Sequence, residues 1–337
     1  MLMTSYFRPI VRTGLPRSEN SISFAETDYW ISEAEEIKFG EKSKLVSIND
    51  VPDFWKTRWL RKRPDILGLE FGFPKLMGII NVTPDSFSDG GNHIELDAAL
   101  NHAKLMERDG VDIIDIGGES TRPGASIVSI LEEIERIEPV INGISARSKI
   151  PISVDTRKSE VASAAHKAGA SLVNDVSGFT FDPNLLDYCS EYKLPVCVMH
   201  MQGSPENMQN NPKYENILIE VYDFLENQIG KLVQAGISRD HIIADVGIGF
   251  GKNLRHNLAL IKNISLFHGL GVPLLLGVSR KSIISNVAKV EKTSDRVHGS
   301  IALAISALGQ GVQLFRVHDV AETKQAFDLW VAVNFGD

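Results

Sequence analysis

Residues 78–91 read GIINVTPDSFSDGG, and the character of the chain changes within them. The first letters form an apolar run typical of a buried β-strand, and the rest form a polar loop rich in Ser, Asp and Gly. Asn81 lies where the apolar run gives way to the polar loop, so the predicted strand would end in an amide side chain. Near-continuous apolar strands of this kind are typical of parallel sheets that are covered on both faces.

Seven more short apolar runs follow the first, which spans residues 75–82. They cover residues 111–118, 151–156, 170–176, 195–200, 241–247, 273–279 and 312–318. Helix-like segments with apolar residues three and four apart lie between them, at residues 96–110, 130–144, 159–169, 216–236, 300–311 and 319–333. Eight strands alternating with helices over about 260 residues predict an α/β fold, a (β/α)8 TIM barrel with an N-terminal extension. An open doubly wound sheet is the alternative, but no GxGxxG follows the first strand.

The first 73 residues differ from the remainder. They hold three of the four tryptophans, Trp30, Trp55 and Trp59, and they show no catalytic spacing. We therefore expect residues 1–73 to form an N-terminal extension, a small docked appendage without an assigned role, and residues 74–337 to form the catalytic barrel. If the extension is only an appendage, a chain lacking residues 1–70 should keep its active-site chemistry.

Composition and charge narrow the possible partners and location. The formal net charge of −8 argues against a nucleic-acid partner. No apolar run reaches the roughly 18 residues that a membrane helix needs, so we expect no membrane partner. Cys189 and Cys197 form no CxxC motif and predict neither zinc nor a disulfide, which favours a cytoplasmic location. The arginines among the first 17 residues resemble an organellar transit peptide only faintly.

Most of the eight apolar runs end in polar residues. These are Asn81, Asp115, Asp155, Asn174, His200, Asp245, Ser279, Arg316 and His318. A barrel gathers the C-terminal ends of its strands on one face, where the active sites of this fold lie. One such residue could be a helix cap or a turn former, but so many together favour a binding site. The carboxylates and amides suit a flat, donor-rich heterocycle, whereas Arg122, Lys281, Arg316 and His318 suit phosphate or carboxylate.

Eight motifs, in order from about Lys75 to the C-terminus, carry a resemblance to the dihydropteroate synthase family. They are MGIINVTPDSFSDGG, IDIGGESTRPGA, ISVDT, NDVSG, VCVMHMQGSP, GIGFGKN, GVSRKS and FRVHDV. The resemblance implies a transferase that joins 4-aminobenzoate to 7,8-dihydropterin-6-ylmethyl diphosphate, releasing pyrophosphate and forming dihydropteroate for folate synthesis. It also implies Mg²⁺ as cofactor, these two small-molecule substrates as partners, and a homodimer.

The resemblance also implies a role for individual residues. The pterin would lie against Asp155, Asn174, Asp245, Lys281, Met199 and Phe250, of which Asp155, Lys281 and Asp245 are the expected catalytic residues. The diphosphate would meet Asn81, Arg122, Arg316 and His318, with Asn81 as the metal ligand, contacting a Mg²⁺ carried on the diphosphate. The 4-aminobenzoate would lie against Thr121, Pro123, Phe87, Ser279 and Ser282.

The chain departs from the family pattern at a few positions. Val246 stands where Pro is usual and Ile248 where an aromatic residue is often found, changes expected to affect pterin packing without removing a group that the chemistry needs. Arg157 is expected to add a positive charge near the mouth of the barrel. Asp115 is expected to organise a loop beside the site.

Two other functions fit parts of this pattern. A methyltetrahydrofolate-dependent methyltransferase would share the pterin-binding acids but needs no diphosphate cluster. The presence of such a cluster, formed by Arg122, Lys281, Arg316 and His318, argues against it. A non-catalytic paralogue would be expected to lack Asn81, Arg316 or His318, and the chain has all three.

Overall fold

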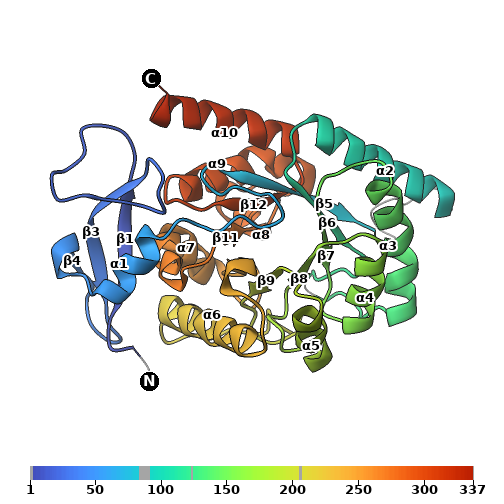
Figure 1. Cartoon of the computed structure of the whole chain (residues 1–337), viewed down its shortest axis with the longest axis horizontal. Helices are drawn as coiled ribbons and strands as arrows, with labels where there is room; N and C mark the ends of the chain where they lie inside the picture. Colours follow the sequence, from blue (N-terminus) through green and yellow to red (C-terminus); the bar gives the residue numbers. More distant parts are fainter. Residues whose placement is uncertain (1–2, 83–91, 123, 205–206, 337) are drawn as a thin grey trace.

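A computed structural model describes residues 3–82, 92–122, 124–204 and 207–336. Eight parallel strands close into a barrel in chain order, with β12 paired to β5 (Figure 1). They are β5 (Lys75–Asn81), β6 (Ile113–Gly117), β7 (Ile152–Asp155), β8 (Leu172–Asp175), β9 (Val196–Met199), β10 (Ile242–Asp245), β11 (Leu274–Leu276) and β12 (Leu314–Val317). The predicted barrel with its N-terminal extension is confirmed, and each of the eight apolar runs contains one of these strands.

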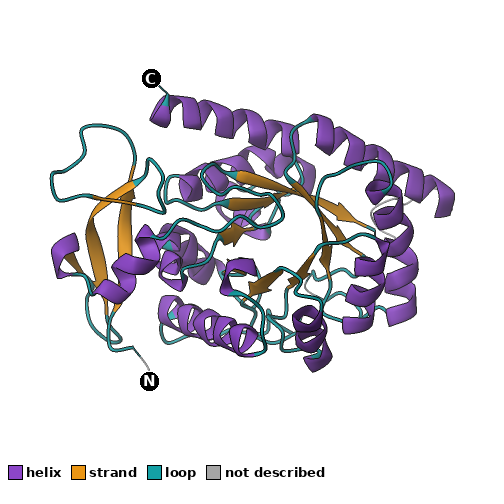
Figure 2. Cartoon of the chain, in the orientation of Figure 1, coloured by secondary structure: helices purple, strands orange, loops and turns teal. Residues whose placement is uncertain are grey.

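Helices surround the barrel strands (Figure 2). The α-helices are α2 (Asn92–Arg108), α3 (Ile130–Ser145), α4 (Ser159–Ala168), α5 (Pro183–Glu191), α6 (Ile217–Gln234), α7 (Leu254–Lys262), α8 (Ser282–Ala288), α9 (Val297–Leu308) and α10 (Val320–Phe335). Short 3₁₀ helices are η3 (Arg239–His241), η4 (Ile264–Leu270) and η5 (Thr293–Arg296). Among the described residues, no helix combines the length and apolar character needed to cross a membrane.

The helical segments predicted from the spacing of apolar residues include none of α5, α7 and α8. These helices have nine, nine and seven residues, so their apolar faces repeat too few times to stand out. A local signal for α5 was nevertheless present. Asp182 accepts a hydrogen bond from the backbone of Asn184 as the N-cap, and Pro183 occupies the first helical position.

The N-terminal extension folds as a small sheet with one helix, at the left of Figure 1. Its elements are β1 (Tyr6–Arg12), β2 (Ile22–Ser23), β3 (Trp30–Ile37), β4 (Lys44–Ser47), η1 (Ile48–Asp50) and α1 (Asp53–Leu60). The antiparallel strand β3 pairs with β1 along one edge, and with β2 and β4 in turn along the other. Strand β1 and helix α1 pack against η4 of the barrel.

Aromatic side chains fix the extension to the outside of the barrel. The rings of Tyr6 and Trp55 lie with their centroids 5.5 and 5.3 Å from that of Tyr222 on α6. Trp55 also lies so close to Gly269 that an added Cβ would fall 2.2 Å from its ring. Arg58 adds an ion pair with Glu226 at 2.8 Å. The extension is therefore a tightly packed cover over α6 and η4.

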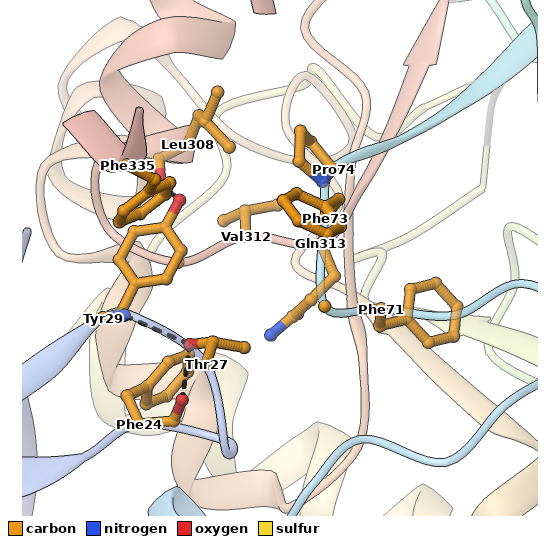
Figure 3. A pocket seen from close by; sticks show the side chains of 12 residues that line it. Phe24, Thr27, Tyr29, Phe71, Phe73, Pro74, Leu308, Val312, Gln313 and Phe335 are labelled. Atoms are coloured by element: carbon orange, nitrogen blue, oxygen red, sulfur yellow. Dashed lines mark hydrogen bonds between the residues drawn. The ribbon is translucent and has the colours of Figure 1, made fainter. Parts of the chain in front are cut away.

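The segment between α1 and β5 closes the base of the barrel. Ile66, Leu69 and Phe71 are buried in one apolar cluster with strand residues that lie inside the barrel, on the side away from the mouth. That cluster contains Met77, Ile113, Leu172, Cys197, Ile243, Leu275 and Leu314. Beside it, Phe71 and Tyr29 line a cavity of about 10 Å³, large enough for one water molecule at most (Figure 3). This cavity lies at the end of the barrel opposite the predicted active site.

This packing changes what we expect from truncation. Deleting residues 1–70 removes the buried aromatics Tyr6, Phe7, Trp55 and Trp59 together with the Ile66–Leu69 contacts at the base. At ~1.5–3 kcal/mol for each buried aromatic, the loss approaches the whole stability of about 5–15 kcal/mol of a typical domain. We expect the truncated chain to aggregate or to unfold well below the melting temperature of the full chain in scanning calorimetry. A soluble truncated chain with an unchanged melting temperature would contradict this. Deletion of residues 1–60 is the milder comparison, because it removes the same aromatics but keeps the Ile66 and Leu69 contacts at the base.

Candidate active site

The register of the barrel brings polar residues to one level at the C-terminal ends of the strands. Asn81 pairs with Gly117 of the next strand, Gly117 pairs with Asp155, and Asp155 pairs with Asn174. A Cβ added at Gly117 would lie in van der Waals contact with Asp155, 3.4 Å from its Cβ, so a side chain here would occupy the space beside that carboxylate. Residues far apart in the chain therefore line one mouth, as the strand-end pattern predicts.

Arg316 of β12 joins two carboxylates at the centre of this mouth. Its Nε donates to Asp115 Oδ2 at 2.6 Å, and a terminal nitrogen donates to Asp155 Oδ2 at 2.9 Å. Asn174 donates to the same oxygen of Asp115 at 3.2 Å. Asp115 is completely buried inside the barrel. It therefore orients Arg316 and Asn174, and the expectation that it organises a loop is wrong.

Asp155 is buried but only partly satisfied. One of its oxygens binds Arg316, whereas Oδ1 is buried without a hydrogen-bond partner among the described residues. Burial raises the pKa of Asp155 to about 7, although the charge of Arg316 opposes this shift. An unpaired buried acceptor is costly, so this oxygen is suited to accept an N–H from a bound ligand.

Lys281 and Asp245 stand on another side of the mouth. Lys281 Nζ donates to the backbone carbonyl of Ile248 and lies 4.8 Å from the centroid of the Phe250 ring. Burial lowers the pKa of Lys281 to about 8, while Asp245 opposes the shift. Asp245 Oδ1 accepts the backbone N–H of Gly247 at 2.8 Å, and burial raises the pKa of this carboxyl. The site thus sets an ammonium group and an aromatic face beside a second carboxylate.

His318 follows β12 within a cationic surrounding. Its Nδ1 lies 3.0 Å from the hydroxyl of Ser279, which also accepts the backbone N–H of His318 at 3.1 Å. Burial, together with the charges of Arg316, Arg280 and Arg122, lowers the pKa of His318 to about 3. The imidazole is therefore neutral at pH 7 and surrounded by positive charge. Arg280, which is held by Asp319, was not singled out from the sequence although it lies within the GVSRKS motif.

The remaining predicted residues lie around these groups. Met199 is buried at the end of β9, and Thr121 is half-buried in the loop after β6. Arg122 is exposed in the same loop, and Ser282 is exposed as the first residue of α8. Phe87 and Pro123 lie outside the described residues.

Sequence reasoning missed a lysine that ties two loops of the site together. Lys252 Nζ donates to the backbone carbonyls of His200 and Phe250 at 3.1 and 2.9 Å, and it lies 2.8 Å from His200 Nδ1. The loop after β9 is thereby fixed to the loop after β10, which carries Phe250. His200, one of the polar residues at the strand ends, belongs to this tie. The GKN sequence at residues 251–253 is the signal that could have drawn attention to it.

A closed barrel whose mouth combines buried carboxylates, an amide and a group of cations defines an enzyme for an anionic heterocycle. The profile of the family described as pterin binding enzyme matches residues 77–318. The chain is 48% identical over 258 residues to the dihydropteroate synthase of Escherichia coli K12, with 77% of this chain and 91% of that one covered. It is 44% identical over 265 residues to the Haemophilus influenzae enzyme of that name, covering 78% and 95%.

Solved structures give the same assignment. The dihydropteroate synthase of Yersinia pestis in complex with a sulfonamide drug superposes with a TM-score of 0.75 at 45% identity, covering 79% of this chain and 96% of that one. The Xanthomonas albilineans dihydropteroate synthase with 4-aminobenzoic acid gives 0.76 at 42% identity, covering 81% and 98%. The chain belongs to the dihydropteroate synthase family. It is accordingly a transferase of folate biosynthesis, and the predicted resemblance is confirmed.

Proposed function

We propose that the mouth of the barrel joins 4-aminobenzoate to 7,8-dihydropterin-6-ylmethyl diphosphate, using the residues assembled there. The observation that carries this proposal is the buried, unpaired Oδ1 of Asp155 beside Arg316. Asp155 Oδ1 can accept a hydrogen bond from an N–H group of a ligand. The neighbouring guanidinium of Arg316 can bind an anionic group of the same ligand. Dihydropterin diphosphate offers both in one molecule.

Asp155, Asn174 and Asp245 would receive the donor edge of the pterin. The amino group and ring N–H of a pterin donate hydrogen bonds, and buried carboxylates accept them strongly. Lys281 would donate to the acceptor side of the ring, and Met199 and Phe250 would cover its faces. This division follows from the donor and acceptor character of each side chain.

The diphosphate would lie against Arg316, His318 and Arg122. The described residues include no cluster of three or more His, Cys, Asp or Glu that could hold a metal ion by itself. A single carboxamide, Asn81 at the end of β5, therefore suits a Mg²⁺ that takes its other ligands from phosphate oxygens and water. When bound, Mg²⁺ would help to neutralise the leaving diphosphate.

Charge development explains why this set of residues suffices. As the bond between the pterin methylene carbon and the diphosphate oxygen breaks, negative charge grows on the leaving group beside Arg316 and positive charge grows on the pterin beside Asp155 and Asp245. The arylamine is neutral at pH 7, so its nitrogen attacks the methylene carbon without a strong base, and the proton then lost from that nitrogen passes to the released pyrophosphate or to water. The low pKa of His318, about 3, agrees with the absence of a histidine base and favours a hydrogen-bonding role toward the anion.

This arrangement predicts a bell-shaped pH dependence of pterin binding. Asp155, with a pKa of about 7, accepts an N–H more strongly when ionised, so binding should weaken as the pH falls below 7. Lys281, with a pKa of about 8, loses its charge as the pH rises, so binding should weaken again above 8. Calorimetric titration with 6-hydroxymethyl-7,8-dihydropterin, which lacks the titrating phosphates, should show a change of about tenfold per pH unit on each side. A dissociation constant that stays level from pH 5.5 to 9.5 would count against it.

Release of pyrophosphate tests the proposal directly. It should require the pterin diphosphate, 4-aminobenzoate and Mg²⁺ together, with dihydropteroate formed in equal amount. Asn81→Ala should raise the Mg²⁺ concentration needed for half-maximal rate and leave binding of the pterin alcohol unchanged. If the full chain binds the pterin diphosphate yet releases nothing when 4-aminobenzoate is added, the proposal fails and a non-catalytic pterin-binding role takes its place.

A homodimer and a cytoplasmic location remain part of the proposal. Cys189 and Cys197 are buried free thiols, which supports a reducing compartment. Light scattering on the purified full chain tests the dimer, and fractionation of cells that express it tests the location.

A further inference from the structure

A buried cluster of four charged residues lies next to the loop that carries Thr121 and Arg122. It consists of Glu119, Glu133, Arg157 and Lys158. We propose that Lys158 is a positioning residue for the second substrate, because it fixes both ends of this loop relative to the strand that carries Asp155. The inference rests on the proposed function and adds a residue to it that touches neither substrate.

The ammonium group of Lys158 has three acceptors within hydrogen-bond distance. They are Glu119 Oε1 at 2.9 Å, Glu133 Oε2 at 2.7 Å and the backbone carbonyl of Val128 at 2.6 Å. An ammonium group has three hydrogens, so all of its hydrogen-bonding capacity is used. Its position is therefore fixed by bonds in three directions.

Two of these acceptors flank the loop. Glu119 precedes residues 120–127 and Val128 follows them, and the backbone N–H of Val128 donates to Glu119 Oε1 at 2.9 Å. One lysine therefore holds both ends of the segment that carries Thr121 and Arg122. Lys158 itself comes three residues after Asp155, in the loop that follows β7. The tie thus connects the aminobenzoate side of the site to the pterin side.

Arg157 completes the cluster and does not add charge at the mouth, where the sequence interpretation placed it. Its Nε donates to Glu119 Oε2 at 3.0 Å, and its guanidinium lies 4.2 Å from the centroid of the Phe181 ring in the loop after β8. None of the four charged side chains is more than 6% exposed. The two carboxylates balance the two cations, as buried charges require.

A double variant can remove the bonds of Lys158 while keeping the net charge of the cluster unchanged. Glu133 accepts a second bond from Thr156 at 2.8 Å, and burial raises its pKa although Lys158 opposes the shift. Lys158→Met alone would leave Glu133 without its cation and could prevent folding. The double variant Glu133→Gln with Lys158→Met removes one charge of each sign, keeps the Glu119–Arg157 pair, and lacks the bonds from Lys158 to the Val128 carbonyl and to Glu119.

The test compares steady-state constants for the two substrates in full-length protein. In the double variant, KM for 4-aminobenzoate should rise by about 10- to 100-fold, as for loss of a positioning contact, whereas the dissociation constant of 6-hydroxymethyl-7,8-dihydropterin should change by no more than about twofold. Lys167→Met, an exposed lysine on α4, is the control and should leave both constants unchanged.

The outcomes distinguish the two levels of the proposal. If the wild-type chain forms no dihydropteroate, the proposed function fails. If the wild-type chain is active and the folded double variant keeps its KM for 4-aminobenzoate, the positioning role of Lys158 is wrong. An equal rise in both constants would also overturn it, because a general loss of structure would not select one substrate.

Discussion

Replacement of Lys281 by Met should lower kcat/KM for the pterin diphosphate by about 10²–10³-fold, the loss typical for removal of one preorganised donor from an active site. Lys281 Nζ donates to the carbonyl of Ile248 and lies 4.8 Å from the centroid of the Phe250 ring. Methionine keeps most of the apolar stem and its contact with the ring. It removes the ammonium group that opposes the raised pKa of Asp245, so that carboxyl should protonate more readily. The variant therefore loses a donor directly and weakens an acceptor indirectly.

Steady-state kinetics at pH 7.5 with both substrates varied would measure this loss. Lys292→Met, a change at an exposed lysine beyond α8, is the matched control and should stay within about twofold of the wild type. Circular dichroism should show that both variants are folded. Near-normal kcat/KM in a folded Lys281→Met protein would remove Lys281 from the pterin site.

The barrel could be predicted from the sequence because its strands have a local signature. Parallel strands covered on both faces must be apolar along their whole length, and the break to polar residues marks the end that faces the active site. Asn81, Asp155, Asn174 and Arg316 each stand at such a break and all lie at the mouth. In a barrel, all residues at the C-terminal ends of the strands lie on one face. These residues could therefore be proposed as members of one site before their contacts were known.

The pairing inside the site could not be predicted in the same way. Arg316 contacts Asp115 across 201 residues of sequence, and nothing in the spacing of the two residues indicates this. Asp115 and Asp155 each have a buried Oδ1 without a hydrogen-bond partner among the described residues, yet Oδ2 of Asp115 accepts from both Asn174 and Arg316, whereas Oδ2 of Asp155 accepts from Arg316. Such differences depend on which side chains reach one another across the barrel.

The contacts of the N-terminal extension could not be predicted from the sequence either. The tryptophans of the first 73 residues led us to expect a docked appendage, but the surface that covers Trp55 belongs to α6 and η4, more than 150 residues further along the chain. Arg157 is a second example. It was expected at the mouth of the barrel because it lies near Asp155 in the sequence, but its side chain is buried against Glu119 and Phe181. In both cases a long-range partner decides the position, and a single sequence does not identify that partner.

Replacement of Arg316 by Met should reduce both stability and activity. The guanidinium bridges Asp115 and Asp155 at 2.6 and 2.9 Å, and these carboxylates are 0% and 8% exposed. Removal of one partner from a buried ion pair typically costs about 3–5 kcal/mol, because the other charge stays buried without compensation. We expect a loss of this size in the free energy of unfolding, measured in urea, and a fall in kcat/KM of about 10³-fold or more, since the diphosphate loses its central cation.

Two comparison variants separate the contributions. Arg316→Lys keeps a charge but lacks the planar fork that reaches both carboxylates, so its stability and activity should lie between those of the wild type and Arg316→Met. Arg12→Met breaks an exposed pair with Glu33 and should change stability by no more than about 1 kcal/mol.

The pH dependence of the Arg316→Met deficit identifies its origin. Arg316 holds the pKa of Asp155 down against burial, so the variant should raise that folded-state pKa further above the ordinary value. A carboxyl whose pKa is raised in the folded state stabilises the fold at low pH, and this stabilisation is lost as the pH rises through that pKa. The deficit in unfolding free energy should therefore be smallest near pH 5, where Asp155 is protonated, and largest near pH 8. An equal deficit at both values would mean that the arginine stabilises the barrel through packing of its stem, and the charge-balance account of this site would have to be abandoned.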